Sequence, residues 1–519
     1  MKFYFDRPVD NNFNFPYCVL KANGWNDWGF LTTFSLFCYL EDGYKLELGN
    51  VKIGKKGMSL PIDYQNTIRT HLDNEFDFLD DQYFSVGDSE YYYKQFYELG
   101  KKNLDVKNNV LERLNDIVQD IDIYNNNMNE DTMRNSLMRS SSVKTIKDVY
   151  YKVLTTGKEE LIPYNFSVTL KNEINNQKMS FLVSPDGLPQ SNIHTLIGRN
   201  GVGKTHFFKS IISKLSDSEE DEELNIIENF EGIDKISSVL AISYSIFDTT
   251  LPKKDIFGSI PYRFIGFTKK IDIFKDQSLN GKTDLKSQSL QSIMENFICD
   301  EFIESVTYLQ NHKFLNELVR KCINTLNSDP VFQSLNVHGW MSVEIPIEDT
   351  RNTFNKLSSG HKVVLLTLFK LIINIEANSV VLIDEPEQNL HPPLISSFVQ
   401  AILNILKERN AMAIIATHSP VIVQECSADS TWILNRSEKS IKIDRPTIKT
   451  FGANVGEITY DVFDLEVEKS GYMKVISDIV DDSNTFEEVI NRFDDKVGSE
   501  SEKIISSIIY QREADDEWI

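Results

Sequence analysis

The sequence predicts an α/β fold in which a mixed central sheet is flanked by helices. Residues 379–383 and 411–416 form short apolar runs, which are typical of strands buried on both faces. Residues 363–375 carry apolar positions at helical spacing and predict a helix packed beside these strands. A glycine-rich loop between a third buried strand and a helix adds phosphate-binding chemistry to this sheet.

The glycine-rich loop fits the pattern G-x-x-x-x-G-K-[ST]. Its glycines let consecutive backbone N–H groups curl around phosphates, while Lys204 reaches the terminal phosphates and the Thr205 hydroxyl ligates Mg²⁺. Residues 193–197 predict the strand that enters the loop. Residues 206–215 predict the helix that leaves it, with its positive dipole end facing the phosphates. The loop consists of Gly198, Arg199, Asn200, Gly201, Val202, Gly203, Lys204 and Thr205.

The chain of 519 residues is too long for one compact core, and the usual scale of about 100–200 residues per domain suggests about two to four units. We expect residues 1–150 to form an N-terminal α+β region that packs on or extends the nucleotide-binding sheet. Residues 151–445 are expected to form the core, with a short helical insertion around 283–328. Residues 446–519 are expected to form an acidic helical region.

The composition restricts location and partners. The net charge of −23 argues against nonspecific nucleic-acid binding over the whole surface, and no dense Lys/Arg cluster is visible, so we expect any DNA contact to be indirect. No apolar run approaches the roughly 20 residues that span a bilayer, and the first ten residues lack a secretion signal. The five cysteines form no C-x-x-C pair, which favours reduced thiols. We expect a cytoplasmic protein with no membrane partner.

Several further elements follow from local patterns. Residues 29–40 and 44–53 alternate well enough to predict a hairpin, with its turn at 41–43. A helical stripe runs through Val110, and residues 124–130, which contain four Asn, predict a loop. The acidic run 216–223 predicts a solvated loop. Further strands are predicted at 165–170, 178–184, 238–244, 262–267, 431–434 and 441–444, and we start the nucleotide-binding sheet near 160.

A second candidate phosphate contact precedes the predicted helix at 363–375. Ser358, Ser359 and Gly360 lie in the sequence Leu-Ser-Ser-Gly-His, where a serine is also suited to cap the helix N-terminus. Beside a phosphate loop, such a segment predicts a second helix end that faces phosphate. Two such ends do not easily clamp one nucleotide from within one small domain, so we expect two copies to pair head-to-tail.

The remaining candidate residues follow two of the buried strands. Asp384 and Glu385 end the strand 379–383, at the edge where open α/β sheets bind ligands. We expect Asp384 to hold Mg²⁺ through water and Glu385 to polarise the attacking water. His418 ends a strand expected to run parallel to the one bearing Glu385, so its ring could contact the terminal phosphate or that water.

These four pieces, in this order, resemble the ABC-type ATPase heads shared by transporters and by the SMC, RecF and OLD-nuclease proteins. The resemblance covers roughly residues 160–436. It implies an ATPase that uses ATP and Mg²⁺, with Ser358 as the signature serine reaching the partner's γ-phosphate and His418 as the switch histidine. It also implies that residues 385–391 hold the loop that touches the partner head.

The departures from the pattern are informative. His361 stands where transporters favour Gln, and His391 replaces the aspartate usual after the preceding leucine. The sequences Glu-Pro-Glu-x-x-Leu-His-Pro and Ala-Thr-His-Ser-Pro look like the RecF/OLD branch. The glutamine expected after the third strand is not visible, because Ser-Tyr-Ser-Ile-Phe-Asp occupies 243–248.

Within that branch the chain resembles stand-alone ATPases of bacterial anti-phage systems such as the PtuA subunit of Septu. We expect a homodimer, or a higher assembly of dimers, that regulates a separately encoded effector, and we expect that effector to be a nuclease. No nuclease motif follows His418, and the eight histidines are dispersed. Three alternatives stay open: a RecF-like repair ATPase that binds DNA directly, the nucleotide-binding subunit of a transporter, and a nuclease whose site is unrecognised.

Overall fold

A computed structural model describes most of the chain. The described residues are 1–6, 14–27, 29–41, 43–59, 67–139, 141–158, 161–171, 177–216, 226–244, 251–256, 260–266, 290–335, 337–341, 345–388, 390–437, 440–463, 471–483, 485–494 and 496–516. The acidic run predicted as a loop lies outside these residues from 217 onward, as does most of the segment 243–248.

A seven-stranded sheet forms the centre of the molecule, in the order β14-β13-β15-β16-β11-β17-β18. Adjacent strands run parallel, except that β17 and β18 are antiparallel. The prediction of an α/β fold with a mixed central sheet is therefore confirmed. The strands are β11 (Ile193–Gly198), β13 (Val239–Ser243), β14 (Tyr262–Gly266), β15 (Val380–Asp384), β16 (Met412–Thr417), β17 (Thr431–Ser437) and β18 (Ser440–Asp444).

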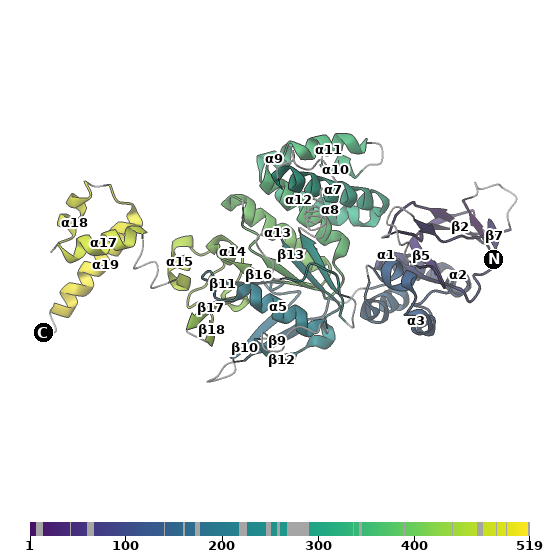
Figure 1. Ribbon diagram of the computed structural model, residues 1–519, viewed down its shortest axis with the longest axis horizontal. Coiled ribbons are helices and arrows are strands. Elements are labelled where there is room, and N and C mark those ends of the chain that lie inside the picture. The colour runs from purple at the N-terminus through teal and green to yellow at the C-terminus, as the bar shows by residue number, and fades with distance from the viewer. Residues whose placement is uncertain are drawn as a thin grey trace, which may run out of the picture.

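Both faces of this sheet are covered, which explains the continuous apolar runs. Side chains such as Val381 and Ile415 pack on one face against helices, and alternating neighbours such as Leu382 and Ile414 pack on the other face against α5 (Lys204–Leu215). The helices that cover the face with Val381 and Ile415 are α7 (Leu290–Asn311), α8 (Asn316–Leu326), α12 (Ser359–Asn374) and α13 (Pro392–Glu408) (Figure 1). Shorter helices follow α8: α9 (Pro330–Ser334), α10 (Val337–Trp340) and α11 (Ile347–Asn355).

The strands predicted at 165–170 and 178–184 form, but not in the central sheet. β9 (Tyr164–Leu170) and β10 (Gln177–Val183) pair antiparallel, and β12 (Ile227–Glu231) completes a separate three-stranded sheet. Starting the nucleotide-binding sheet near 160 was therefore wrong. Only alternate residues of β10 are buried, because this small sheet uses one face to cover α5, whereas β11 is buried throughout.

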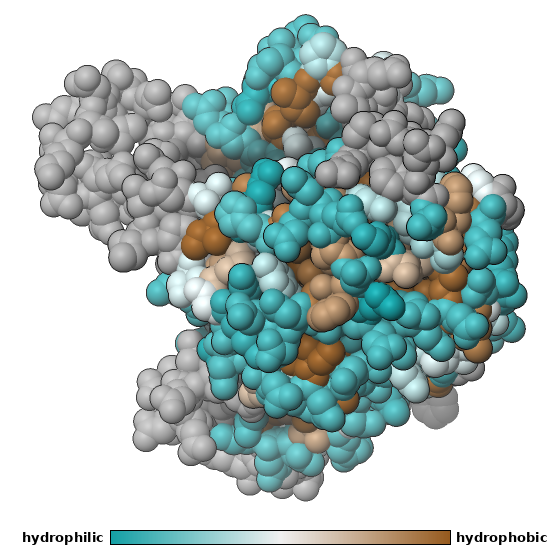
Figure 2. Space-filling model, turned by 90° about the vertical axis from the view of Figure 1, so that its right-hand side faces the viewer, coloured by the Kyte–Doolittle hydropathy of each residue, from teal (hydrophilic) through white to brown (hydrophobic). Residues whose placement is uncertain are grey.

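The N-terminal region has its own six-stranded sheet, in the order β7-β1-β2-β4-β5-β8. Its strands are β1 (Lys2–Phe5), β2 (Tyr17–Ala22), β4 (Thr33–Tyr39), β5 (Lys45–Lys55), β7 (Glu75–Phe76) and β8 (Tyr83–Gly87), and β3 (Phe30–Leu31) pairs with β6 (Ile68–Arg69) nearby. The predicted hairpin is confirmed as β4 and β5. The face that this region turns away from the central sheet is mostly hydrophilic, with small hydrophobic patches (Figure 2).

Helices cover one face of the N-terminal sheet and share one core with it. These are α1 (Glu90–Lys102), α2 (Leu104–Arg113), α3 (Ile121–Asn127), the π-helical segments Met133–Leu137 and Thr145–Tyr150, and α4 (Tyr151–Thr156). The predicted loop at 124–130 is wrong for residues 124–127, because α3 extends to Asn127, and is confirmed for residues 128–130, which form a turn. The Asp120 side chain accepts a hydrogen bond from the Asp122 N–H and caps this helix, which offsets the poor helix propensity of three consecutive Asn.

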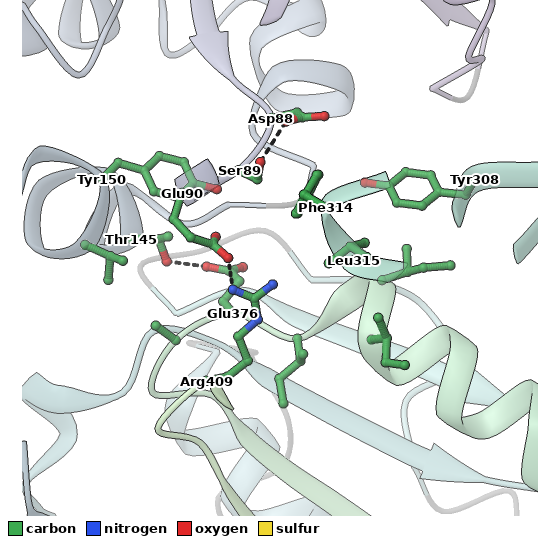
Figure 3. Close-up of a pocket in the computed structure, with 15 residues that line it drawn as sticks. Asp88, Ser89, Glu90, Thr145, Tyr150, Tyr308, Phe314, Leu315, Glu376 and Arg409 are labelled. Carbon is green, nitrogen blue, oxygen red and sulfur yellow. Dashed lines mark hydrogen bonds and ion pairs between the residues drawn. The ribbon is translucent and has the colours of Figure 1, made fainter. Parts of the chain in front are cut away.

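A buried polar network joins the N-terminal region to the central sheet (Figure 3). Glu90 of α1 forms an ion pair with Arg409, which precedes β16. Glu376, which precedes β15, accepts hydrogen bonds from the Ser142 N–H at 2.9 Å and from the Thr145 hydroxyl. The N-terminal region therefore contacts the amino ends of two central strands.

The C-terminal helices leave the central sheet in two steps (Figure 1). α15 (Val455–Phe463) packs against β11, β17 and α14 (Pro420–Gln424). Then α17 (Gly471–Asp481), α18 (Phe486–Arg492) and α19 (Ser499–Asp516) form a small core of their own. Among the described helices, none combines the length and the apolar character needed to cross a membrane.

Candidate nucleotide site

The phosphate loop connects β11 to α5 at the carboxyl edge of the central sheet. Gly201 and Gly203 have φ values of 77° and 107°, a left-handed conformation that glycine adopts without steric cost. Gly198 is required for a different reason: a Cβ atom there would lie 2.3 Å from the Leu434 carbonyl oxygen of β17. The glycines thus allow both the turn and the close packing of the strand that enters it.

Lys204 lies at the centre of the site and is buried. Its Nζ donates to the carbonyl oxygens of Gly198 at 2.9 Å and Arg199 at 3.2 Å. It also lies 2.8 Å from Nε2 of His418. Burial lowers the pKa of Lys204, and the nearby carboxylates of Glu385 and Asp384 act in the opposite direction. The lysine is therefore held by acceptors that a phosphate oxygen could replace.

Thr205 and Asp384 come together as a pair suited to Mg²⁺. The Thr205 hydroxyl donates to Asp384 Oδ2 at 2.9 Å, although the two residues lie on different elements. Mg²⁺ in nucleotide sites commonly takes one or two protein oxygens and completes its shell with water and phosphates. These two oxygens fit that requirement. No group of three or more acidic, His or Cys side chains suited to a metal occurs among the described residues.

Glu385 and His418 meet where β15 and β16 end side by side. His418 Nε2 lies 3.0 Å from Glu385 Oε1, and Gln388 Nε2 donates to Glu385 Oε2 at 2.8 Å. Glu385 has a φ of 46°, unusual for a residue with a side chain, and its N–H is held by the Ala416 carbonyl at 2.9 Å. His418 Nε2 can serve one partner at a time: unprotonated it accepts from Lys204, and protonated it donates to Glu385.

Glu387 is a site residue to which the sequence analysis gave no role. Its Oε1 accepts from the Thr417 hydroxyl and from the His418 N–H, both at 2.7 Å. It therefore ties the segment after β15 to the segment after β16 and fixes the backbone that carries His418. The second acid of Glu-Pro-Glu was the sequence signal that could have identified it.

The signature segment, residues 358–360, lies at the start of α12, away from the contacts of Lys204, Asp384, Glu385 and His418. Ser358 caps this helix, as predicted, since its Oγ accepts from the His361 N–H at 3.4 Å. Ser358 and Ser359 are exposed and Gly360 is buried. Among the described contacts, none joins these three residues to the phosphate loop, Asp384, Glu385 or His418. The structure thus brings together the residues predicted to bind the nucleotide within one chain, namely the phosphate loop, Asp384, Glu385 and His418. Ser358, which is predicted to reach the nucleotide of a partner, is exposed instead.

A comparison over nearly the whole chain identifies the family. Protein ea59 of Escherichia phage lambda is 31% identical over 527 residues, covering 95% of this chain and 95% of that protein. The chain belongs to the ea59 family.

A shorter similarity concerns the ATPase part of this ea59-family chain. It is 32% identical over 78 residues to the Retron Vc95 probable ATPase of Vibrio cholerae serotype O1 biovar El Tor, covering 15% of each chain. Residues 324–424, which include Ser358, Asp384, Glu385 and His418, match the family model described as "AAA domain, putative AbiEii toxin, Type IV TA system". Together with the phosphate loop, these matches identify a P-loop ATPase of AAA type.

Solved structures of ATPase heads align over about half of the ea59-family chain. An SMC head bound to the C-terminal winged-helix domain of ScpA covers 55% of this chain and 97% of its own, with 10% identity and a TM-score of 0.27. An ATP-binding cassette of an ABC transporter in its ADP conformation covers 59% and 98%, with 12% identity and a TM-score of 0.26. Because these scores are low, the fold assignment rests on the strand order and the phosphate loop.

Proposed function

We propose that this ea59-family chain is an ATP-hydrolysing switch that closes as a head-to-tail dimer around two ATP molecules. The observation that carries the proposal is the meeting of Lys204, the Thr205–Asp384 pair and the Glu385–His418 pair at one sheet edge. These are the groups needed to hold phosphates, to hold Mg²⁺ and to activate water.

Each residue has one step in this mechanism. Lys204 and the loop amides bind the phosphates, while Thr205 and Asp384 would hold Mg²⁺, which neutralises phosphate charge when bound. A phosphate that draws Lys204 away would free His418 Nε2 to take a proton and donate to Glu385 or to the terminal phosphate. Glu385 would then orient the attacking water and accept its proton.

The second half of the site would come from another copy. Ser358 is exposed at a helix N-terminus, where backbone N–H groups and the helix dipole favour an anion. Closure of the dimer would then depend on the γ-phosphate, and hydrolysis would reopen it. We place the output in a separately encoded effector, a nuclease, in bacterial anti-phage defence. The matches to a phage protein and a retron ATPase agree with a setting in which phage and host compete.

Two substitutions separate binding from turnover. Lys204→Ala should abolish nucleotide binding, because the main side-chain cation for phosphate is lost. Glu385→Gln should bind ATP and trap the closed dimer, because the amide cannot accept the proton of the attacking water. Fluorescent-nucleotide titration and analytical ultracentrifugation with ATP measure the two effects. Equal ATP turnover by Glu385→Gln and wild type would remove Glu385 from its assigned role.

A lysine-lined cavity supports direct DNA contact as a second candidate function. It has a volume of about 450 Å³ and lies between the 144–158 segment and the amino ends of β15 and β16. Among its described lining residues Asp148 is the acid, and the bases are Lys144, Lys147, Lys152, Lys158, Lys235 and Arg409. Four of these bases are spaced along residues 144–158 without forming a dense run in the sequence, and folding adds Lys235 and Arg409 to them.

Salt dependence tests that second function. If the cavity contacts phosphates, Lys147→Ala should weaken duplex binding and reduce the slope of log affinity against log salt by about 1. Lys474→Ala, on the distant helix α17, is the matched control and should leave both unchanged. Equal effects of the two substitutions would exclude this cavity as the DNA site.

A further inference from the structure

His361 and His391, which depart from the pattern of ABC-type ATPase heads, both contact the carboxylate of Asp329. His361 Nε2 lies 3.4 Å from Asp329 Oδ1, and His391 Nε2 lies 3.5 Å from Asp329 Oδ2. His361 belongs to the signature segment at the start of α12, and His391 precedes α13. Asp329 thus links the signature segment to the loop that follows Glu385.

Asp329 is well fixed for this task. It is 8% exposed, and its Oδ1 accepts from the Val331 N–H at 2.8 Å, which caps α9. The ring of Phe332, on the same short helix, packs 5.0 Å from the His361 ring. Backbone capping and ring packing together hold the carboxylate against the imidazole.

The other nitrogen of His361 contacts the signature serine. His361 Nδ1 lies 2.5 Å from Ser358 Oγ, which also receives the His361 backbone N–H. Asp329 accepts only from a protonated Nε2, so it keeps a hydrogen on Nε2, and the direction of the Ser358 contact is then set by whether Nδ1 also carries a hydrogen. A bare Nδ1 accepts the Ser358 hydroxyl hydrogen. A protonated Nδ1 donates to Oγ instead, and the hydroxyl hydrogen then turns outward.

We propose that His361, held by Asp329, is a positioning residue that makes the Ser358 hydroxyl a donor to the γ-phosphate bound by the partner subunit. The proposal rests on the head-to-tail dimer of the proposed function. With His361 as imidazolium, Oγ receives two hydrogen bonds from its own chain and has one hydrogen left for phosphate. The negative phosphate in turn favours that imidazolium, so serine orientation and dimer closure support each other.

The shared carboxylate also couples His391 to this arrangement. His391 is half exposed, at 54%, in the loop expected to touch the partner. When a partner contact draws His391 from Asp329, the carboxylate has one imidazole left to stabilise. The geometry therefore assigns Asp329 the role of connecting partner contact to serine orientation.

Dimer formation in the Glu385→Gln background tests the proposal. Asp329→Asn and His361→Gln should each weaken ATP-dependent dimerisation about tenfold, since a charge-assisted donor to phosphate is lost, while ATP affinity of the monomer stays unchanged. Asp120→Asn is the matched control, because it also removes a helix-capping carboxylate, but from α3 in the N-terminal region. Thermal melting of each variant reports any loss of fold.

A double-mutant cycle distinguishes positioning from general packing. If Asp329 and His361 act through Ser358, adding either substitution to Ser358→Ala should weaken the dimer no further. Additive losses would overturn the inference. If Ser358→Ala itself leaves ATP-dependent dimerisation intact, the trans contact of the proposed function fails. If Ser358→Ala weakens the dimer and Asp329→Asn does not, only the present inference fails.

Discussion

At the scale of single residues, the site depends on hydrogen bonds that fix backbone as much as on the reacting groups. Glu387 illustrates this, because it accepts from the Thr417 hydroxyl and from the His418 N–H. Two strand ends that carry Glu385 and His418 are thereby held at one spacing. A residue with no proposed contact to phosphate can then set the geometry of Glu385 and His418.

Glu387→Ala should lower the ATP turnover rate by about tenfold or more with little change in ATP affinity. The reason is that His418 loses the acceptor for its backbone N–H, a loss of about 1–3 kcal/mol for a buried donor. Steady-state kinetics beside nucleotide titration separates the two quantities. Glu387→Gln keeps an acceptor oxygen and should retain most of the turnover; a defect equal to that of alanine would refute the backbone role.

Asp116, in the N-terminal region, predicts a pH dependence of stability. Burial raises its pKa from 3.8 to about 7, although Val118 N–H, Gln119 N–H and the Tyr93 hydroxyl donate to it. Between about pH 4 and 7 the folded state therefore binds more protons than the unfolded state, and the free energy of unfolding falls as pH rises. The loss should be on the order of a few kcal/mol.

Denaturant unfolding at about pH 5 and pH 7 measures this effect, followed through the N-terminal tyrosines. Asp116→Asn stays neutral at both values and should flatten the difference. An equally steep pH dependence in the variant would assign the effect to other groups.

At the scale of elements, the entry strand of the phosphate loop is fixed by its neighbour. Gly198→Ala should lower thermal stability and weaken nucleotide binding, because its Cβ would meet the Leu434 carbonyl at 2.3 Å and backbone cannot move aside cheaply. Strain of this kind typically costs about 1–3 kcal/mol. Gly187→Ala, whose nearest atom would be at 3.4 Å, is the control and should be nearly neutral. Equal melting temperatures would contradict this explanation.

Elements with a strong local pattern could be predicted from the sequence. The run 379–383 became β15 and the alternating segments at 29–53 became a hairpin, because burial on both faces or on one face leaves a distinct signature. The segment 124–127 was misjudged, since a cap and tertiary packing outweighed the propensity of Asn. The separate sheet of β9 and β10 could not be foreseen, because strand patterns do not state which strands pair.

The site residues that lie in sequence motifs could be predicted, and those outside motifs could not. Lys204, Thr205, Asp384, Glu385 and His418 were predicted from their positions after buried strands, and the structure brings them together. Asp329 was missed because it lies 29 residues before Ser358 in a stretch without a motif, and only folding places it beside His361.

At the scale of the whole molecule, buried polar contacts join the N-terminal region to the ATPase core. Glu376 is buried, and burial raises its pKa. The Ser142 N–H and the Thr145 hydroxyl donate to its Oε2, and Arg263 lies 3.6 Å from its Oε1 as an ion-pair partner. A buried ion pair contributes little net stability, but removing one partner is costly, because the other charge stays buried without compensation.

Glu376→Ala should therefore destabilise the protein by about 3–5 kcal/mol and expose the 142–156 segment to limited proteolysis, because Arg263 is left buried without its partner. The exposed pair Lys321–Glu408 provides a control, and Glu408→Ala should change stability by less than about 1 kcal/mol. Denaturant titration and protease cleavage maps give both readouts. Unchanged cleavage in Glu376→Ala would mean that other contacts hold the two parts together.

The strand β15 runs from beside Glu376 at one end to Asp384 and Glu385 at the other. It is hydrogen-bonded to β13 and β16 along its length, so it cannot slide past either neighbour without breaking both ladders. A shift of the Asp384 end of β15 would therefore carry β13 and β16 with it. The N-terminal region contacts the other ends of β15 and β16 through Glu376 and Arg409, so it lies where such a shift would be felt.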